Sequence, residues 1–132
     1  MTSSPPDRAP TLLLDTPPLL SAPQRARDLA VAAVLAWDLP VPVDELCLLA
    51  GELTANAVVH AATRLTIGIQ ARADAVRIEV TDRDSRLPLL SAPHLAQESH
   101  RGLMLVAALA TRWGVESRDD GKVVWAEVDF PA

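Results

Sequence analysis

Residues 46–61 read Leu-Cys-Leu-Leu-Ala-Gly-Glu-Leu-Thr-Ala-Asn-Ala-Val-Val-His-Ala. The stretch is apolar on almost every side of a helix, and Glu52 carries its only formal charge. A helix on a protein surface normally has a charged stripe opposite its apolar face. The pattern therefore predicts a largely buried helix, which Asp44 can cap and which runs to about residue 61 or 62.

The polar residues of this helix are concentrated on one face. Glu52, Asn56 and His60 are spaced four residues apart and so lie above one another. Burying an unpaired carboxylate costs several kcal/mol, so this face must either be paired internally or line a wet cavity.

Two interpretations of this face remain open. In the first, Glu52 pairs with an arginine and Asn56 caps a strand edge. In the second, the two side chains serve phosphoryl transfer: the amide oxygen ligates magnesium, and the carboxylate orients or deprotonates a nucleophile.

Length and composition predict one folded domain. The chain has 132 residues, of which 49% are hydrophobic and 22% charged. Six of its eleven prolines lie in residues 1–23, so residues 1–10 are expected to form an extended or disordered leader before a domain of residues 11–132.

The overall charge restricts the expected partners. A net charge of -5 argues against a nucleic-acid or anionic-membrane partner and favours a protein or a small ligand. No stretch approaches the roughly 18 uncharged apolar residues of a membrane span, so we expect a cytoplasmic location. The single cysteine, Cys47, cannot form an internal disulfide.

Periodicity along the rest of the chain predicts an α+β fold. Ser21 and Gln24 have the form of a capping box for the first helix. Near the C-terminus, the Asp-Gly sequence ending at Gly121 predicts a hairpin turn. Lys122 follows this turn and is expected to be exposed. The expected elements are a strand at 11–16, a helix at 22–37, the helix described above, strands at 65–71 and 76–81, a long connection at 82–99, a helix at 103–113, and strands at 115–118 and 122–130. This order predicts a two-layer sandwich with helices on one face of a mainly antiparallel mixed sheet.

Three segments together resemble those of a known ATPase superfamily. Glu52-Leu-Thr-Ala-Asn56-Ala-Val-Val-His60-Ala61 resembles the N box of the GHKL ATPases, whose histidine kinase-like (Bergerat) fold is found in gyrase, histidine kinases and bacterial anti-sigma factor serine/threonine kinases. Val80-Thr-Asp82 resembles the first glycine box, and Arg101-Gly-Leu-Met-Leu-Val106 resembles the second. Trp113-Gly114 and Gly121-Lys-Val-Val-Trp125 resemble the closing strands of the small anti-sigma type, so the likeness covers about residues 11–130.

The resemblance implies ATP and Mg²⁺ as cofactors and a role for each matching residue. Glu52 would be the catalytic residue acting on the attacking group, and Asn56 would hold Mg²⁺ together with the nucleotide phosphates. Asp82 would accept a hydrogen bond from the adenine amino group. The second glycine box would supply the remaining nucleotide contacts, namely Arg101, Gly102 and Leu103.

The resemblance also implies protein partners. In anti-sigma kinases the phosphate acceptor is a serine or threonine of an anti-anti-sigma protein, and the kinase also grips a sigma factor. The chain is therefore expected to phosphorylate or sequester a partner in a partner-switching system, and to form a homodimer.

Three residues depart from the family's pattern. Asp84 replaces a small residue after the aspartate, His100 replaces a glycine before Arg101, and Val123 takes the place of a hydroxyl residue beside Asp82. They favour an alternative, a catalytically silent partner-binding module that has lost productive nucleotide binding. An ATPase that only hydrolyses is a weaker third interpretation, because the chain has no transducer domain to use the motion.

Overall fold

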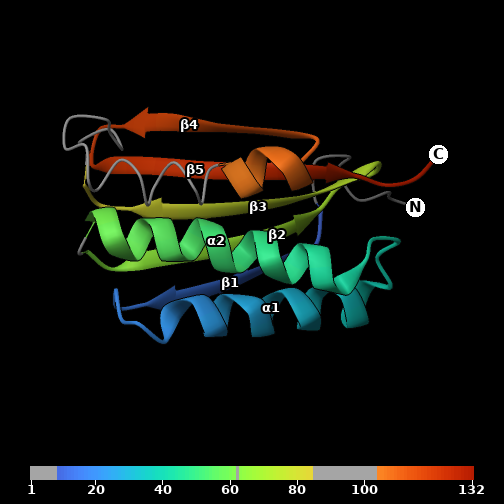
Figure 1. The fold of residues 1–132 in the computed structure, drawn as a ribbon, viewed down its shortest axis with the longest axis horizontal. Helices are drawn as coiled ribbons and strands as arrows, with labels where there is room; N and C mark the ends of the chain where they lie inside the picture. The colour runs from blue at the N-terminus through green and yellow to red at the C-terminus, as the bar shows by residue number, and fades with distance from the viewer. Residues whose placement is uncertain (1–8, 62, 85–103) are drawn as a thin grey trace, which may run out of the picture.

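The computed structural model describes residues 9–61, 63–84 and 104–132. The described strands form a five-stranded sheet in the order β1-β2-β3-β5-β4, and every neighbouring pair is antiparallel. The elements are β1 (Thr11–Thr16), α1 (Ala22–Trp37), α2 (Val43–Ala61), β2 (Leu65–Ala71), β3 (Ala75–Asp82), β4 (Arg112–Arg118) and β5 (Gly121–Asp129), and residues 104–109 form a short helix. The helices cover one face of this sheet (Figure 1), which confirms the two-layer α+β sandwich.

The first helix has the predicted span but not the predicted cap. Ser21 adopts a helical backbone conformation and its side chain makes no capping hydrogen bond, so the capping-box prediction was wrong. Asp38 ends the helix: its φ of 49° is left-handed, and its N–H donates to the carbonyl of Val34. In α2, Asp44 lies within the first turn, because the helix already begins at Val43.

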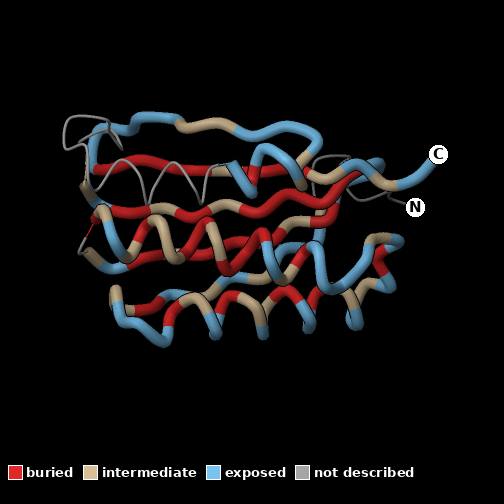
Figure 2. The backbone as a smooth tube through the Cα atoms, in the orientation of Figure 1, coloured by how far each residue is buried: buried red, intermediate tan, exposed pale blue. Residues whose placement is uncertain are grey.

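The core lies between the helices and the sheet. Leu46, Leu49 and Leu53 of α2 are at most 1% exposed. They belong to one cluster with the inward-facing strand residues Leu65, Ile67, Ile69, Val76, Ile78 and Val80. Figure 2 shows burial along β2, β3 and β5 and along the inner turns of both helices, whereas β4 is an exposed edge. Each buried aliphatic side chain contributes about 1.5 to 3 kcal/mol, so this packing fixes which face α2 turns outward.

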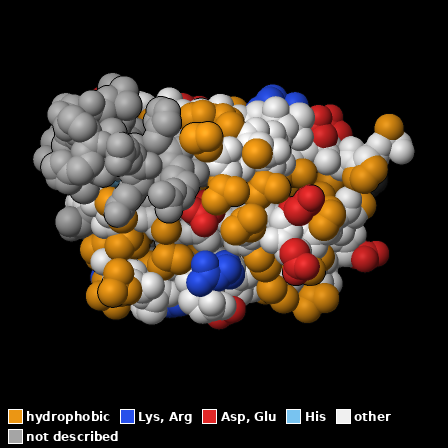
Figure 3. All heavy atoms as spheres, in the orientation of Figure 1, with side chains coloured by type: hydrophobic (Ala, Val, Ile, Leu, Met, Phe, Trp, Pro, Cys, Tyr) orange, Lys and Arg blue, Asp and Glu red, His pale blue; other side chains and the backbone are white. Residues whose placement is uncertain are grey.

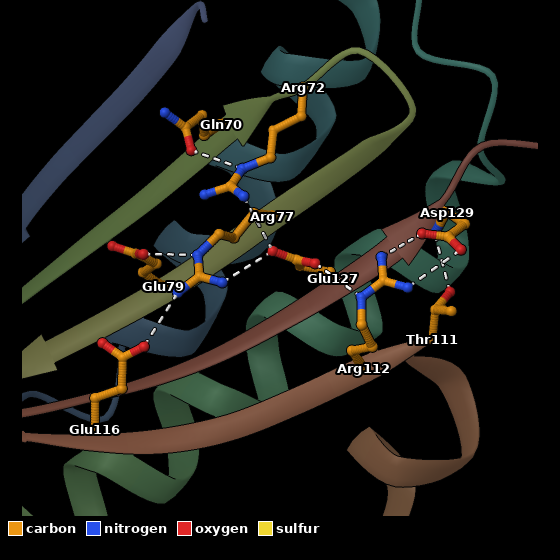
Figure 4. Close-up of polar contacts among 9 residues, drawn as sticks. All are labelled: Gln70, Arg72, Arg77, Glu79, Thr111, Arg112, Glu116, Glu127 and Asp129. Atoms are coloured by element: carbon orange, nitrogen blue, oxygen red, sulfur yellow. Dashed lines mark hydrogen bonds and ion pairs between the residues drawn. The ribbon is translucent and has the colours of Figure 1, made fainter. Parts of the chain in front are cut away.

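The sheet face opposite the helices carries a charged network (Figure 4). Arg77 donates to Glu79 at 2.7 Å and to Glu127 at 2.9 Å, and its guanidinium lies 4.3 Å from the centre of the Trp125 ring. Glu127 also accepts from Arg112 at 3.0 Å. Because the side chains of Arg77 and Glu127 are only 10% and 11% exposed, these pairs hold β3 and β5 together away from the core.

The C-terminal part departs from the prediction in one respect. The helix expected at 103–113 ends at residue 109 among the described residues, and Trp113 lies in β4, where it is 37% exposed. Val106, which lies in this helix, is fully buried. The hairpin turn is confirmed at Asp119 and Asp120, and Gly121 is already the first residue of β5.

Candidate functional site

The outward edge of α2 presents Glu52 and Asn56 one turn apart. Both residues are half-buried, because the neighbouring Leu53 and Ala57 face the core. Neither side chain makes a hydrogen bond or ion pair with any other part of the chain that the structure describes. The interpretation in which Glu52 pairs with an arginine and Asn56 caps a strand edge therefore finds no support in the described residues.

The C-terminal end of α2 meets the end of β3. The backbone N–H of Arg83 donates to Oγ1 of Thr63 at 3.0 Å. Burial and the positive charge of Lys122 lower the pKa of His60, although the charge of Asp82 opposes this effect. His60 is therefore neutral at pH 7 and lies within electrostatic reach of both strand residues.

Asp82 and Lys122 form a buried ion pair at this end of the sheet. The two residues face each other in the β3–β5 register, and the Lys122 Nζ lies 2.9 Å from Oδ2 of Asp82. The Lys122 ammonium also donates to the carbonyl of Asp84 at 3.1 Å, and the N–H of Asp84 donates to Oδ1 of Asp82 at 2.8 Å. With side chains 3% and 1% exposed, the pair is among the most buried charges in the described chain.

This geometry corrects two predictions. Lys122 is buried rather than exposed, and Lys122 rather than Val123 lies against Asp82, because Val123 pairs with Thr81 and faces the opposite side of the sheet. The signal was available in the sequence. Lys122 lies two and four residues before the inward-facing Val124 and Ala126. Because every second residue of a strand points to the same face, alternation alone turns the Lys122 side chain toward the helices.

The structure therefore brings together part of the expected site. His60, Asp82 and Lys122 converge at one end of the molecule, and Asn56 and Glu52 follow one and two turns back along α2. Sequence reasoning missed Lys122 as a site residue. The expected contacts from Arg101, Gly102 and Leu103, and the departure at His100, lie outside the described residues.

The described side chains fit the metal and phosphates of a magnesium–nucleotide complex better than they fit its adenine base. Carboxylate and amide oxygens are the hard ligands that Mg²⁺ prefers, and those of Glu52 and Asn56 are partly exposed and uncommitted within the described residues. Asp82, which would receive the adenine amino group, already accepts a hydrogen bond at each of its oxygens. The arrangement suits a metal and phosphates, whereas the acceptor expected for the base is buried and already paired with an ammonium.

A separate depression of about 850 Å³ lies at the other end of the sheet. Its lining includes Trp37, Leu39, Arg72, Asp74 and Phe130, from the end of α1, the β2–β3 turn and the C-terminal segment. It contains no residue of the expected site.

Comparison with known proteins identifies the family of the chain. The family model described as a histidine kinase-like ATPase domain matches residues 18–128, which include α2, Asp82 and Lys122. The chain belongs to this family. Membership in the histidine kinase-like ATPase family confirms the fold class and supports ATP binding.

A relative is also found among curated proteins. An uncharacterized protein of Streptomyces coelicolor is 51% identical over 53 residues, which are 39% of this chain and 50% of the relative. The match thus spans about half the length of that relative. None of the described helices has the length and apolarity needed to cross a membrane.

Proposed function

We propose that this chain is an ATP-binding regulator of the anti-sigma factor serine/threonine kinase type, which phosphorylates or sequesters a protein partner. The observation that carries the proposal is the pair of uncommitted polar side chains, Glu52 and Asn56, which lie half-buried and one turn apart on a helix whose inner side packs against the core. Such an edge tolerates a carboxylate because water or a bound ligand solvates it.

Each side chain would have a separate task. Asn56 would supply an amide oxygen to Mg²⁺ and so hold the β- and γ-phosphates, as the metal in phosphoryl transfer neutralises charge on those groups. Glu52 would accept the proton of an attacking hydroxyl on the partner protein. A bound Mg²⁺–ATP would supply the phosphoryl group.

The metal-binding part is tested by calorimetry with Mg²⁺ and ADP. Replacing Asn56 with alanine removes one ligand of a charged group, so we expect a loss of about 10- to 100-fold in Mg²⁺–ADP affinity. ADP affinity measured without Mg²⁺ should change much less. Equal affinity of Asn56→Ala and native protein in the presence of Mg²⁺ would remove Asn56 from the site.

The catalytic part is tested with the same protein and a candidate serine-containing partner. Glu52→Gln should slow phosphoryl transfer by about 10²- to 10⁴-fold while Mg²⁺–ADP affinity stays within about threefold. Glu45→Gln is the matched control, because Glu45 is an exposed residue in the first turn of the same helix. Unchanged transfer by Glu52→Gln would contradict the proposed role.

A specific observation favours a second candidate, the silent partner-binding module. The Asp82 carboxylate is already satisfied by Lys122 and by the backbone of Asp84. This candidate predicts partner binding that does not change when millimolar Mg²⁺–ATP is added, whereas a kinase would release or modify its partner.

A further inference from the structure

We propose that Lys122 is a specificity-determining residue of the nucleotide site, which weakens binding of adenine nucleotides and removes their preference over 6-oxopurine nucleotides. The inference rests on the proposed function and concerns its base subsite. It starts from one juxtaposition: the Lys122 ammonium lies 2.9 Å from the carboxylate on which adenine would depend.

Both oxygens of the Asp82 carboxylate already accept a hydrogen bond. One oxygen receives Lys122 and the other receives the N–H of Asp84. The adenine amino group is a donor, so it gains a strong hydrogen bond only from an acceptor that is accessible and not already neutralised. To reach Asp82 it must share an oxygen with the Lys122 ammonium or with the Asp84 N–H, or displace one of these donors.

Displacing Lys122 from Asp82 is energetically unfavourable. Lys122 and Asp82 are almost fully buried, and Lys122 is also held by the Asp84 carbonyl at 3.1 Å. Separating a buried ion pair leaves two charges without compensation, which costs more than one hydrogen bond to a neutral amino group returns. Lys122 therefore stays in place, and its four-carbon stem occupies the space beside Asp82.

The Lys122 ammonium also affects which purine base the site prefers. An ammonium carries three donors, of which two are used by Asp82 and Asp84. The remaining donor complements a carbonyl oxygen, such as O6 of hypoxanthine, and repels an amino group. Inosine and adenosine diphosphates differ at this position, so their affinity ratio reports on Lys122 directly.

The experiment is calorimetry of the full chain with Mg²⁺–ADP and Mg²⁺–IDP, comparing the native protein with Lys122→Thr. The native protein should bind both nucleotides weakly and within about threefold of each other. Lys122→Thr frees the Asp82 acceptor, so ADP affinity should rise by at least about 10-fold, whereas IDP affinity should not rise because O6 loses the Lys122 donor. Arg118→Thr is the matched control, since it removes the same charge from the same hairpin at a half-exposed position and should leave both affinities within about twofold.

Lys122→Thr leaves a buried carboxylate without a cation, which destabilises the fold. A second variant keeps the test decisive if this protein does not fold. Lys122→Gln keeps a neutral donor for Asp82 and should raise ADP affinity severalfold while IDP affinity stays near native. If the native protein binds ADP, weakly or tightly, and neither folded variant binds it more tightly, the inference on Lys122 fails while nucleotide binding stands. If neither native protein nor a folded variant binds any nucleotide, both the inference and the proposed function fail.

Discussion

Replacing Glu127 with alanine should lower the free energy of unfolding by about 3 kcal/mol. Glu127 is 11% exposed and is the acceptor shared by Arg77 and Arg112. Without Glu127, the buried Arg77 still pairs with Glu79 at 2.7 Å and, more weakly, with Glu116 at 3.9 Å. Because Arg77 keeps these partners, the loss of stability lies at the lower end of the range for breaking a buried ion pair. Urea denaturation at pH 7 measures it.

The control for this prediction is Arg118→Ala. Arg118 pairs with Glu116 at 3.6 Å, but both side chains are about half exposed, and such pairs contribute about 0 to 1 kcal/mol. Equal losses from the Glu127 and Arg118 substitutions would mean that the network on the open sheet face does not stabilise the fold.

The same residue predicts how stability depends on pH. Burial alone would raise the pKa of Glu127, but hydrogen bonds from Arg77 and Arg112, together with the charges of Arg72 and Arg77, outweigh it, and the pKa lies below its ordinary value. This stabilisation is complete above the pKa of an unfolded glutamate, about 4.3, and is lost as pH falls through the lower pKa of the folded state. Native protein should therefore lose more stability between pH 5 and pH 3 than Glu127→Gln does.

Gly121→Ala should destabilise the fold by about 3 kcal/mol or more and disturb the Asp82–Lys122 pair. A Cβ at position 121 would lie 1.9 Å from the carbonyl oxygen of Asp82 and 2.9 Å from Cα of Arg83. Both neighbours are backbone, so β3 and β5 must separate at the end where Lys122 meets Asp82. Thermal denaturation measures the loss, and the nitrogen and proton shifts of the Lys122 amide report the local change.

Gly68→Ala is the matched control within the same sheet. Its added Cβ would lie 3.2 Å from the tip of Leu13, an exposed and movable side chain. We expect a change within about 0.5 kcal/mol. A Gly121→Ala protein as stable as Gly68→Ala would show that β5 does not approach Asp82 as closely as described.

Much of this fold could be predicted because local patterns and burial agree. Strict alternation through Ile67, Ile69, Ile78 and Val80 defined two strands. The apolar residues around Glu52 correctly predicted a helix that packs on the core, but Leu48 and Val59 of that helix are exposed rather than buried. The errors arose where tertiary contacts decide the outcome. Trp113 matches a helical face by spacing, yet it joins the β4 edge, whose hydrogen bonds to β5 are not visible in local sequence.

The candidate site could be predicted only in part. Glu52, Asn56 and Asp82 were found through their motifs and the cost of burying charge. Lys122 was missed because its role depends on the β3–β5 register, which places it opposite Asp82 across 40 residues of chain. Hydrophobic patterning fixes which face a strand buries, but not which buried charges meet.

On the surface, exposed hydrophobic residues are scattered along the helices rather than gathered into one field. Figure 3 shows hydrophobic side chains interspersed with single acidic and basic groups on this face. Exposed members on α1 and α2 are Val31, Leu35, Val43, Leu48 and Val59. Such dispersed residues are normal for a folded domain, so the proposed partner contact rests on the site rather than on this surface.

The most direct test of where nucleotide binds is a titration of ¹⁵N-labelled protein with Mg²⁺–ADP, followed by two-dimensional nitrogen–proton spectra. Weak binding suffices, because fast exchange still moves the amide peaks. We expect shifts concentrated at Asn56, His60, Asp82 and Lys122, with Trp37 and Phe130 at the far end unchanged. Shifts confined to Trp37, Phe130 and the β2–β3 turn, or no shifts at millimolar nucleotide, would contradict it.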